Sequence, residues 1–232
     1  MKRTKYPRTP HHPLSEEVKS DDKLILADAL RQLIGIEMVA SIKADGESST
    51  NYPDGYSHCR SIDSAADETN SWVRGFAQSI GYTLSDIDRI CGENLYAKHS
   101  IHYTDLTSYF YCFNVWNKDN VALSWDETVE YCRLRNIHTV KEVWRGILTE
   151  QVVKDLWASM DLNVNEGLVF RVAESIPYAD FEKKTFKLVR NGHVQTDKHW
   201  KREKLVKNLV VDGGQSDYRI EPTQEYFDSL TQ

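Results

Sequence analysis

The chain has 232 residues, of which 40% are hydrophobic and 28% are charged, as expected for a globular domain with one sizeable core. No apolar run approaches the roughly 18 residues of a membrane-spanning helix, and the basic N-terminus has no apolar stretch typical of a secretory signal. The four cysteines are 32, 21 and 20 residues apart and form no CxxC pair, which argues against a zinc knuckle or a thioredoxin-type redox site. We therefore expect a cytoplasmic protein with reduced thiols and no contact with a membrane.

Positive charge is concentrated in one stretch of an otherwise acidic chain. The net charge is −6, yet residues 183–207 contain nine lysine and arginine residues against two acidic residues, so this stretch carries +7 and the rest carries −13. An acidic body with a basic patch favours a protein that holds a polyanion on one face, although such a run can also be a solvated helix surface. We predict that Lys198, Lys201 and Arg202 contact nucleic acid.

The first part of the chain alternates extended and helical patterns. Residues 1–22 contain three of the six prolines and a polar stretch, and we expect them to form an extended arm. The apolar residues 35–46 predict a strand that runs into a turn at Asp45-Gly46, and residues 56–62 predict a second strand. Large apolar side chains recur at helical spacing within residues 66–80, which predicts an amphipathic helix.

Apolar and aromatic segments dominate the middle of the chain. Residues 89–97 and 108–116 predict two buried strands. A helix is expected to begin at Ser124, because Glu127 follows three residues later in the spacing of a capping box. A second helix is expected to begin near Thr149.

The remaining segments complete a mixed pattern. Residues 167–172 and 186–190 predict two further strands, and residues from about 197 to 232 are expected to form a largely helical tail. Because no linker interrupts the chain, we expect a single domain of α+β class over residues 1–232, with mostly antiparallel strands.

The sequence Lys43-Ala44-Asp45-Gly46 directly follows the first apolar strand and is the sharpest candidate for catalysis. A lysine at the end of a buried strand can lose water and lie near other cations, and both effects lower its pKa. The neutral amine is a nucleophile, whereas the ammonium form is not. The same four residues can also form an ordinary surface turn, so the motif gains weight only from the residues that follow it.

Five further residues are candidates for a site, although each has an ordinary structural explanation. An arginine is most often on the surface, a phenylalanine in an aromatic strand is most often in the core, and a glutamate before a glycine is common in turns. The candidates, in chain order, are Arg60, Glu93, Phe113, Glu166 and Lys187. Together with the lysine motif they occur in the order of one known arrangement.

The chain resembles the covalent nucleotidyltransferase superfamily of polynucleotide ligases and RNA capping enzymes, and within it the RNA ligases of the phage RNA-ligase-2 type. The similar segments are KYPRTPHHP, KADGE, SHCRSID, CGENLYAKHSI, LSWDETV, NEGLVFR and FKLVRNGHVQTDKHW. The resemblance implies a nucleotidyltransferase domain of two twisted antiparallel β-sheets with flanking helices, with ATP in the groove between the sheets. It also implies an ATP-dependent RNA ligase that joins 5′-phosphate and 3′-hydroxyl ends through a lysyl-AMP intermediate.

The resemblance implies that four residues act at the phosphates. Lys43 would attack the α-phosphorus of ATP, and Asp45 would support the turn that carries it and could contact the water shell of the metal. Lys187 would neutralise the α-phosphate, and Glu166 would help to hold Mg²⁺ or Mn²⁺ through its water shell. The metal and Lys187 would also lower the pKa of Lys43.

Other residues would bind the nucleoside in a member of this family. Arg60 would contact the ribose or a phosphate, Glu93 would hold the ribose hydroxyls, and Phe113 would stack on the adenine. The expected partners are ATP and RNA ends, including those of a nicked duplex, and no protein partner is predicted. A phage-encoded member would act in the cytoplasm of its host.

Three positions depart from the pattern of the family. Ile42 stands where a glutamate is common, Ser48 where an asparagine is common, and Val189 where a second lysine is common. Arg190 is the candidate replacement for that lysine as a cofactor-binding residue, although its strand parity is opposite. The departures leave open a member that binds nucleic acid without turnover. A DNA ligase and a GTP-using enzyme of the capping type are further alternatives.

Overall fold

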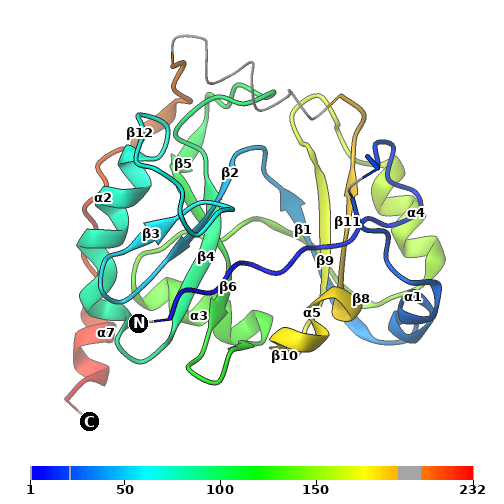
Figure 1. Cartoon of the computed structure of the whole chain (residues 1–232), viewed down its shortest axis with the longest axis horizontal. Coiled ribbons are helices and arrows are strands. Elements are labelled where there is room, and N and C mark those ends of the chain that lie inside the picture. The colour runs from blue at the N-terminus through cyan, green and yellow to red at the C-terminus, as the bar shows by residue number, and fades with distance from the viewer. Residues whose placement is uncertain (1, 21, 193–204, 232) are drawn as a thin grey trace.

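Two antiparallel β-sheets stand side by side in the computed structural model of the chain, which describes residues 2–20, 22–192 and 205–231 (Figure 1). The first sheet has four strands in the order β11 (Thr185–Val189), β9 (Gly167–Val172), β1 (Glu37–Lys43) and β8 (Glu142–Ile147). The second has six strands in the order β10 (Ile176–Pro177), β7 (Val121–Ala122), β6 (Phe110–Trp116), β4 (Arg89–Asn94), β2 (Glu47–Asn51) and β3 (Ser57–His58). The α+β class and the two antiparallel sheets predicted from the sequence are confirmed.

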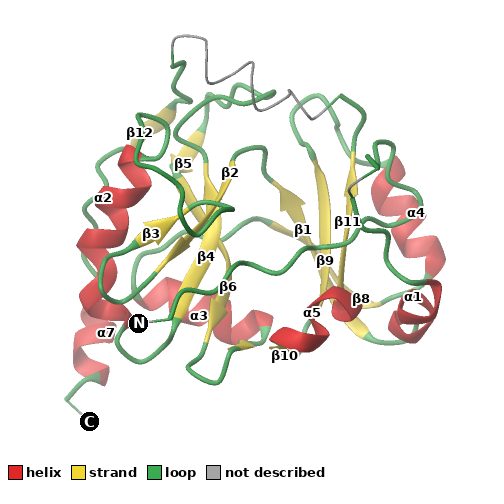
Figure 2. Ribbon diagram, viewed as in Figure 1, coloured by secondary structure: helices red, strands yellow, loops and turns green. Residues whose placement is uncertain are grey.

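Helices cover the outer faces of both sheets (Figure 2). Beside the four-stranded sheet lie α1 (Ala27–Leu33) and α4 (Glu150–Ala158), and beside the six-stranded sheet lie α2 (Ser71–Ile80) and α7 (Gln224–Ser229). The other helices of the described residues are α3 (Trp125–Leu134), α5 (Phe181–Lys184) and the 3₁₀ turns Gly81–Leu84 and Tyr178–Asp180. Among the residues described, no helix is long and apolar enough to cross a membrane.

Two helices have the features that the local sequence predicts. The predicted face of α2 is buried in the cluster that packs on the six-stranded sheet, and it consists of Trp72, Val73, Phe76 and Ile80. Both hydrogen bonds of the capping box at the start of α3 are present. The Ser124 amide donates to the Glu127 carboxylate at 2.9 Å, and the Glu127 amide donates to the Ser124 hydroxyl at 3.3 Å.

The chain crosses from one sheet to the other immediately after β1. This strand lies between β8 and β9, ends at Lys43, and is followed by β2 of the six-stranded sheet only four residues later. Gly46 lies so close to β4 that a Cβ atom there would collide with the backbone oxygen of Asn94. The K-x-D-G motif is therefore the connection between the two sheets, and its glycine permits the close approach.

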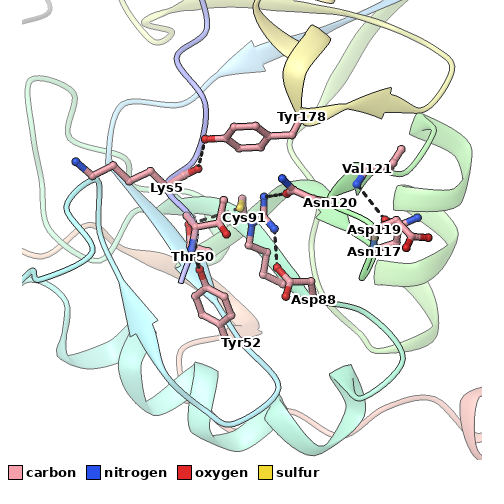
Figure 3. Close-up of polar contacts among 12 residues, drawn as sticks. Lys5, Thr50, Tyr52, Asp88, Cys91, Asn117, Asp119, Asn120, Val121 and Tyr178 are labelled. Carbon is pink, nitrogen blue, oxygen red and sulfur yellow. Dashed lines mark hydrogen bonds and ion pairs between the residues drawn. The ribbon is translucent and has the colours of Figure 1, made fainter. Parts of the chain in front are cut away.

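The N-terminal arm spans both sheets. On the side of the six-stranded sheet, the Thr4 amide donates to the Tyr52 hydroxyl at 2.9 Å, and the Tyr178 hydroxyl donates to the backbone oxygen of Lys5 at 2.9 Å (Figure 3). On the side of the four-stranded sheet, the His12 amide donates to the backbone oxygen of Lys187 at 2.8 Å. Residues 2–20 contain no helix, and they tie the two halves of the molecule together (Figure 1).

The C-terminal tail differs from its predicted form. Residues 205–231 contain the strand β12 (Val210–Gln215), which runs parallel to β5 (Leu106–Ser108), and only one helix of six residues, α7. The expectation of a largely helical tail is wrong for this part of the chain, because Gly213 adopts a positive φ of 80° and β5 offers β12 a pairing edge that the local pattern did not reveal. The tail then packs along the six-stranded half, where the Trp72 indole donates to the backbone oxygen of Ser216 at 2.9 Å.

Candidate functional site

One cavity of about 450 Å³ lies between the two sheets, a size typical of small-molecule sites. Residues from both sheets and from the N-terminal arm line it. The lining includes seven residues that the sequence singled out, namely Lys43, Asp45, Arg60, Glu93, Phe113, Glu166 and Lys187. Two of the departures from the family pattern, Ile42 and Ser48, line the same cavity.

An ion pair between Lys43 and Glu166 lies in the lining of this cavity. The Lys43 ammonium donates to Oε2 of Glu166 at 2.6 Å, and the carboxylate is almost fully buried. Strand pairing brings the two residues together, because Lys43 ends β1 opposite Gly167 at the start of β9. A Cβ atom at Gly167 would collide with the backbone oxygen of Leu188 in β11, so the glycine after Glu166 allows these strands to pack at the site.

Acidic neighbours dominate the electrostatics of Lys43. Burial alone would lower the pKa of this lysine, but Glu166, Glu93 and Asp45 raise it above the ordinary value. In the protein without metal or nucleotide, these carboxylates outweigh the lowering of the pKa of Lys43 that Lys187 was expected to cause, and the effect of a bound metal stays a prediction. In the same cluster, burial raises the pKa of Glu93 to about 8, and Glu166 and Asp45 contribute while Lys43 opposes the shift.

Neighbouring positive charge lowers the pKa of Lys187 instead. Burial, and after it the charge of Lys43, lower the pKa of Lys187 to about 8. Its backbone is fixed by the N-terminal arm, since its amide donates to the oxygen of Pro10 at 2.9 Å and its carbonyl accepts from the His12 amide. These contacts hold the His11-His12 segment against β11.

The hydrogen bonds of the Asp45 carboxylate hold the turn that carries Lys43. One of its oxygens accepts three hydrogen bonds from a single loop, from the Ser100 amide at 2.8 Å, the Ser100 hydroxyl at 2.6 Å and the Ile101 amide at 2.7 Å. The Asp45 amide donates to the Tyr103 hydroxyl at 2.9 Å. Asp45 therefore anchors the segment that carries Lys43.

Phe113 both lines the cavity and packs on its wall. Its ring lies edge-on to that of Tyr6 from the N-terminal arm, with 5.0 Å between centroids. It also packs against two of the buried apolar clusters. The two interpretations of Phe113 are thus compatible, because one face can support the core while the ring borders the cavity.

Arg190 and the basic stretch differ from the other predicted site residues. Arg190 is not among the residues that line the cavity, and its guanidinium donates to the Ser100 hydroxyl at 3.1 Å. This agrees with the strand parity, which is opposite to that of Lys187. The predicted nucleic-acid contacts Lys198, Lys201 and Arg202 lie outside the described residues.

The sequence did not single out three polar residues that lie deep in the cavity, Tyr6, Asn114 and Arg171. The Tyr6 hydroxyl is hydrogen-bonded to the Asn114 side chain at 2.7 Å, and the Arg171 guanidinium donates to the backbone oxygen of Leu123 at 2.6 Å. Burial lowers the pKa of Arg171 to about 10. For these three residues, the only signal in the sequence was Arg171 in an apolar strand. Arginine is rare at buried positions unless its charge is paired.

The oxygen donors in the cavity lining suit a hard divalent cation. Glu166 places a carboxylate beside Lys43, with the carboxyl group of Glu93 close by, and Mg²⁺ typically takes one or two protein carboxylates together with substrate phosphates. Within the described part of the chain, no group of three or more acidic, histidine or cysteine residues forms a complete metal cage. The residues therefore fit a cation that is held partly by a bound polyphosphate.

Comparisons with known proteins agree on one family. A family model described as RNA ligase matches residues 36–189. A solved structure of a Naegleria gruberi RNA ligase variant with ATP and Mn is 20% identical, with a TM-score of 0.54 over 82% of this chain and 64% of that chain. The same ligase with pyrophosphate is 22% identical, with a TM-score of 0.53 over 86% of this chain and 65% of that chain.

A more distant similarity extends to DNA ligases. A candidate ATP-dependent DNA ligase of Aquifex aeolicus is 17% identical, with a TM-score of 0.51 over 80% of this chain and 50% of that chain. A search of curated proteins finds no match. The chain spans less than two thirds of the length of these solved relatives, and the similarity at such identities establishes the fold.

Proposed function

Since the chain belongs to the RNA ligase family, we propose that it is an ATP-dependent RNA ligase that joins 5′-phosphate and 3′-hydroxyl ends through a lysyl-AMP intermediate. The observation that carries the proposal is the position of Lys43, which ends β1 in the lining of a nucleotide-sized cavity with Glu166, Glu93 and Lys187 around it. The Naegleria gruberi ligase with ATP and Mn supports ATP and a divalent cation as cofactors.

The first step requires a neutral Lys43. Its Nζ would attack the α-phosphorus of ATP, forming a P–N bond while the bond to pyrophosphate breaks. The proton that Lys43 must lose already lies in a 2.6 Å hydrogen bond to Glu166, so that carboxylate is positioned to accept it. Lys187 would stabilise the charge that develops on the phosphate oxygens.

The later steps transfer the nucleotide and close the strand. The AMP would pass from Lys43 to a 5′-phosphate end, and a 3′-hydroxyl would then displace AMP. When bound, Mg²⁺ or Mn²⁺ would neutralise charge at the phosphates, and Glu166 would help to hold the ion through its water shell. Arg60 and Glu93 would hold the ribose and its neighbouring phosphate, and both line the cavity.

Joining of RNA ends tests the proposal directly. A 5′-phosphorylated, 3′-hydroxyl RNA nick and the matching DNA nick are each incubated with the protein, Mg²⁺ and either ATP or GTP. We expect joined RNA with ATP. Joining of DNA alone would favour the DNA ligase alternative, and a covalent adduct with GTP but not ATP would favour a capping-type enzyme. No adduct with either nucleotide would favour a nucleic-acid-binding protein without turnover.

Phe113→Leu is expected to weaken ATP binding about 5- to 150-fold, because stacking on a base contributes about 1–3 kcal/mol. Equilibrium binding of ATP measures the effect. The matched control is Phe110→Leu in the same strand, since Phe110 is fully buried and does not line the cavity. If both variants bind ATP equally well, Phe113 acts only as a core residue.

We further propose that the basic stretch 183–207 contacts the nucleic-acid backbone, with Lys187 the exception that faces ATP. Its net charge of +7 on an acidic chain supports the proposal. If about five of its cations meet phosphates, the logarithm of RNA affinity should fall with the logarithm of salt concentration at a slope of about −4. Replacing Lys198, Lys201 and Arg202 with alanine should flatten that slope and leave self-adenylylation intact.

A charge-matched control separates local contacts from the loss of net charge. Lys118, Lys154 and Arg219 are exposed and lie outside both the basic stretch and the cavity lining. Their triple replacement with alanine removes the same charge and should keep the slope. If the triple variant of Lys198, Lys201 and Arg202 instead loses self-adenylylation and its RNA affinity keeps the wild-type dependence on salt, the basic stretch acts at the nucleotide site.

A further inference from the structure

The turn that carries Lys43 is held by one loop, residues 95–103. Three donors of this loop converge on a single carboxylate oxygen of Asp45, and the Tyr103 hydroxyl accepts from the Asp45 amide. The Asp45 side chain is 5% exposed, so these bonds form in a region of low dielectric, where they are stronger than in water. The position of Lys43, two residues before Asp45, therefore depends on the conformation of the loop.

Asn208 closes the base of that loop. Its side-chain nitrogen donates to the backbone oxygens of Leu95 at 2.8 Å and Ala97 at 3.2 Å, and its side-chain oxygen accepts from the Tyr103 amide at 2.9 Å. One side chain thus binds the first and last residues of the loop. Asn208 itself has no exposed surface.

The backbone of Asn208 joins the same network. Its amide donates to the oxygen of Tyr96 at 3.1 Å, and its carbonyl accepts from the Tyr109 hydroxyl at 2.9 Å. A buried polar network with every member bonded rigidifies the segments that it joins. Without Asn208, backbone groups at both ends of the loop would lose their partners inside the protein, which favours rearrangement of the loop.

We infer that Asn208 is a positioning residue for nucleotidyl transfer. It acts through loop 95–103 and Asp45, and it sets where the amine of Lys43 lies relative to a bound nucleotide. The inference rests on the proposed function, and Asn208 lies beyond residues 36–189 that the family model matches. Asn208 does not line the cavity, so it acts on the position of Lys43 and not on the nucleotide itself.

The expected signature is a loss of rate without a loss of binding. Asn208→Ala should lower the single-turnover rate of lysyl-AMP formation at saturating ATP by about 10- to 100-fold, because displacements near 1 Å have effects of this size. The dissociation constant for ATP should change less than about threefold. Hydrogen exchange of the Ser100 and Ile101 amides, which donate to Asp45, should become faster.

Asn70 offers a matched control in the same half of the molecule. It is 2% exposed, its side chain donates to the backbone oxygen of Ala65 at 3.1 Å and accepts from Arg74 at 2.9 Å, and it does not line the cavity. Asn70→Ala should lower the melting temperature by a similar amount and keep the adenylylation rate. The two variants are compared under conditions in which the same fraction of each is folded. If Asn70→Ala and Asn208→Ala then lower the adenylylation rate equally, Asn208 has only a structural role.

A double-mutant cycle with Ser100 tests the route of the effect. Ser100→Ala removes the hydroxyl that bonds Asp45, and its effect on rate should not add to that of Asn208→Ala, because both act on the same contact. Additive effects would overturn the inference. If Asn208→Ala does not fold, Asn208→Asp replaces it, since that variant keeps the acceptor for Tyr103 but places an oxygen instead of the donor nitrogen against the backbone oxygens of Leu95 and Ala97.

Wild-type protein separates the two proposals. If the wild type forms lysyl-AMP and Asn208→Ala forms it at the same rate, the inference about Asn208 fails while the proposed function stands. If the wild type forms no adduct, the proposed function fails, and positioning for nucleotidyl transfer fails with it. Unchanged hydrogen exchange in loop 95–103 of the variant would contradict the role of Asn208 without reference to activity.

Discussion

Lys43→Ala is expected to abolish the transfer of label from α-labelled ATP to the protein. The strand pairing of β1 with β9 places this amine against Glu166 at 2.6 Å, and we expect no lysine elsewhere in the described part of the chain to replace it. Lys43→Arg should be equally inactive, since a guanidinium stays protonated at any working pH and cannot act as a nucleophile. Both variants are expected to fold, because the Lys43 side chain is partly exposed at the end of its strand.

The control for this experiment is Lys154→Ala. Lys154 is exposed on α4 and does not line the cavity, so its removal should leave label transfer unchanged. Label retained by Lys43→Ala at the wild-type rate would show that another residue is the nucleophile.

Glu166→Gln is expected to slow adenylylation by at least about 100-fold, because it removes the carboxylate that would hold the metal and accept the proton of Lys43. The melting temperature should stay within a few degrees of the wild type, since glutamine has nearly the same shape. Single-turnover label transfer at saturating ATP and Mg²⁺ measures the rate, and thermal unfolding measures the stability.

The direction in which Glu166→Gln changes the adenylylation rate is informative, because Glu166 affects the pKa of Lys43. Glu166 raises the pKa of Lys43, so its removal lowers that pKa and increases the fraction of neutral amine at a given pH. If deprotonation of Lys43 were the only role of the site, Glu166→Gln would react faster than the wild type. A slower reaction is expected, and a faster one, or a large loss of stability with full activity, would contradict the role assigned to Glu166.

Local sequence predicted the elements that carry the site. The apolar run before Lys43 became β1, the aromatic run around Phe113 became β6, and the capping residues at Ser124 started α3 where expected. Each of these signals lies within a few residues of the feature that it specifies. Seven of the predicted site residues line one cavity, whereas Arg190 does not, and the roles of these residues stay predictions.

Features that depend on distant residues were not predictable in the same way. The strand β2 was missed because its sequence, ESSTN, is polar, although pairing with β4 and β3 buries Ser49, Thr50 and Asn51. The tail was expected to be helical, but its strand forms against β5, about 100 residues earlier in the chain. The raised pKa of Lys43 follows from carboxylates that three separate strands and turns bring together, which no local pattern reports.

The most direct test of the central claim is the intact mass of the wild-type protein after incubation with ATP and Mg²⁺. The protein is first treated with pyrophosphate and Mg²⁺ to remove any nucleotide that it already carries, and the mass is then compared before and after ATP. We expect a gain of one AMP per chain, which maps to the peptide that contains Lys43 and is absent from Lys43→Ala. An unchanged mass, or an AMP that maps to another residue, would contradict it.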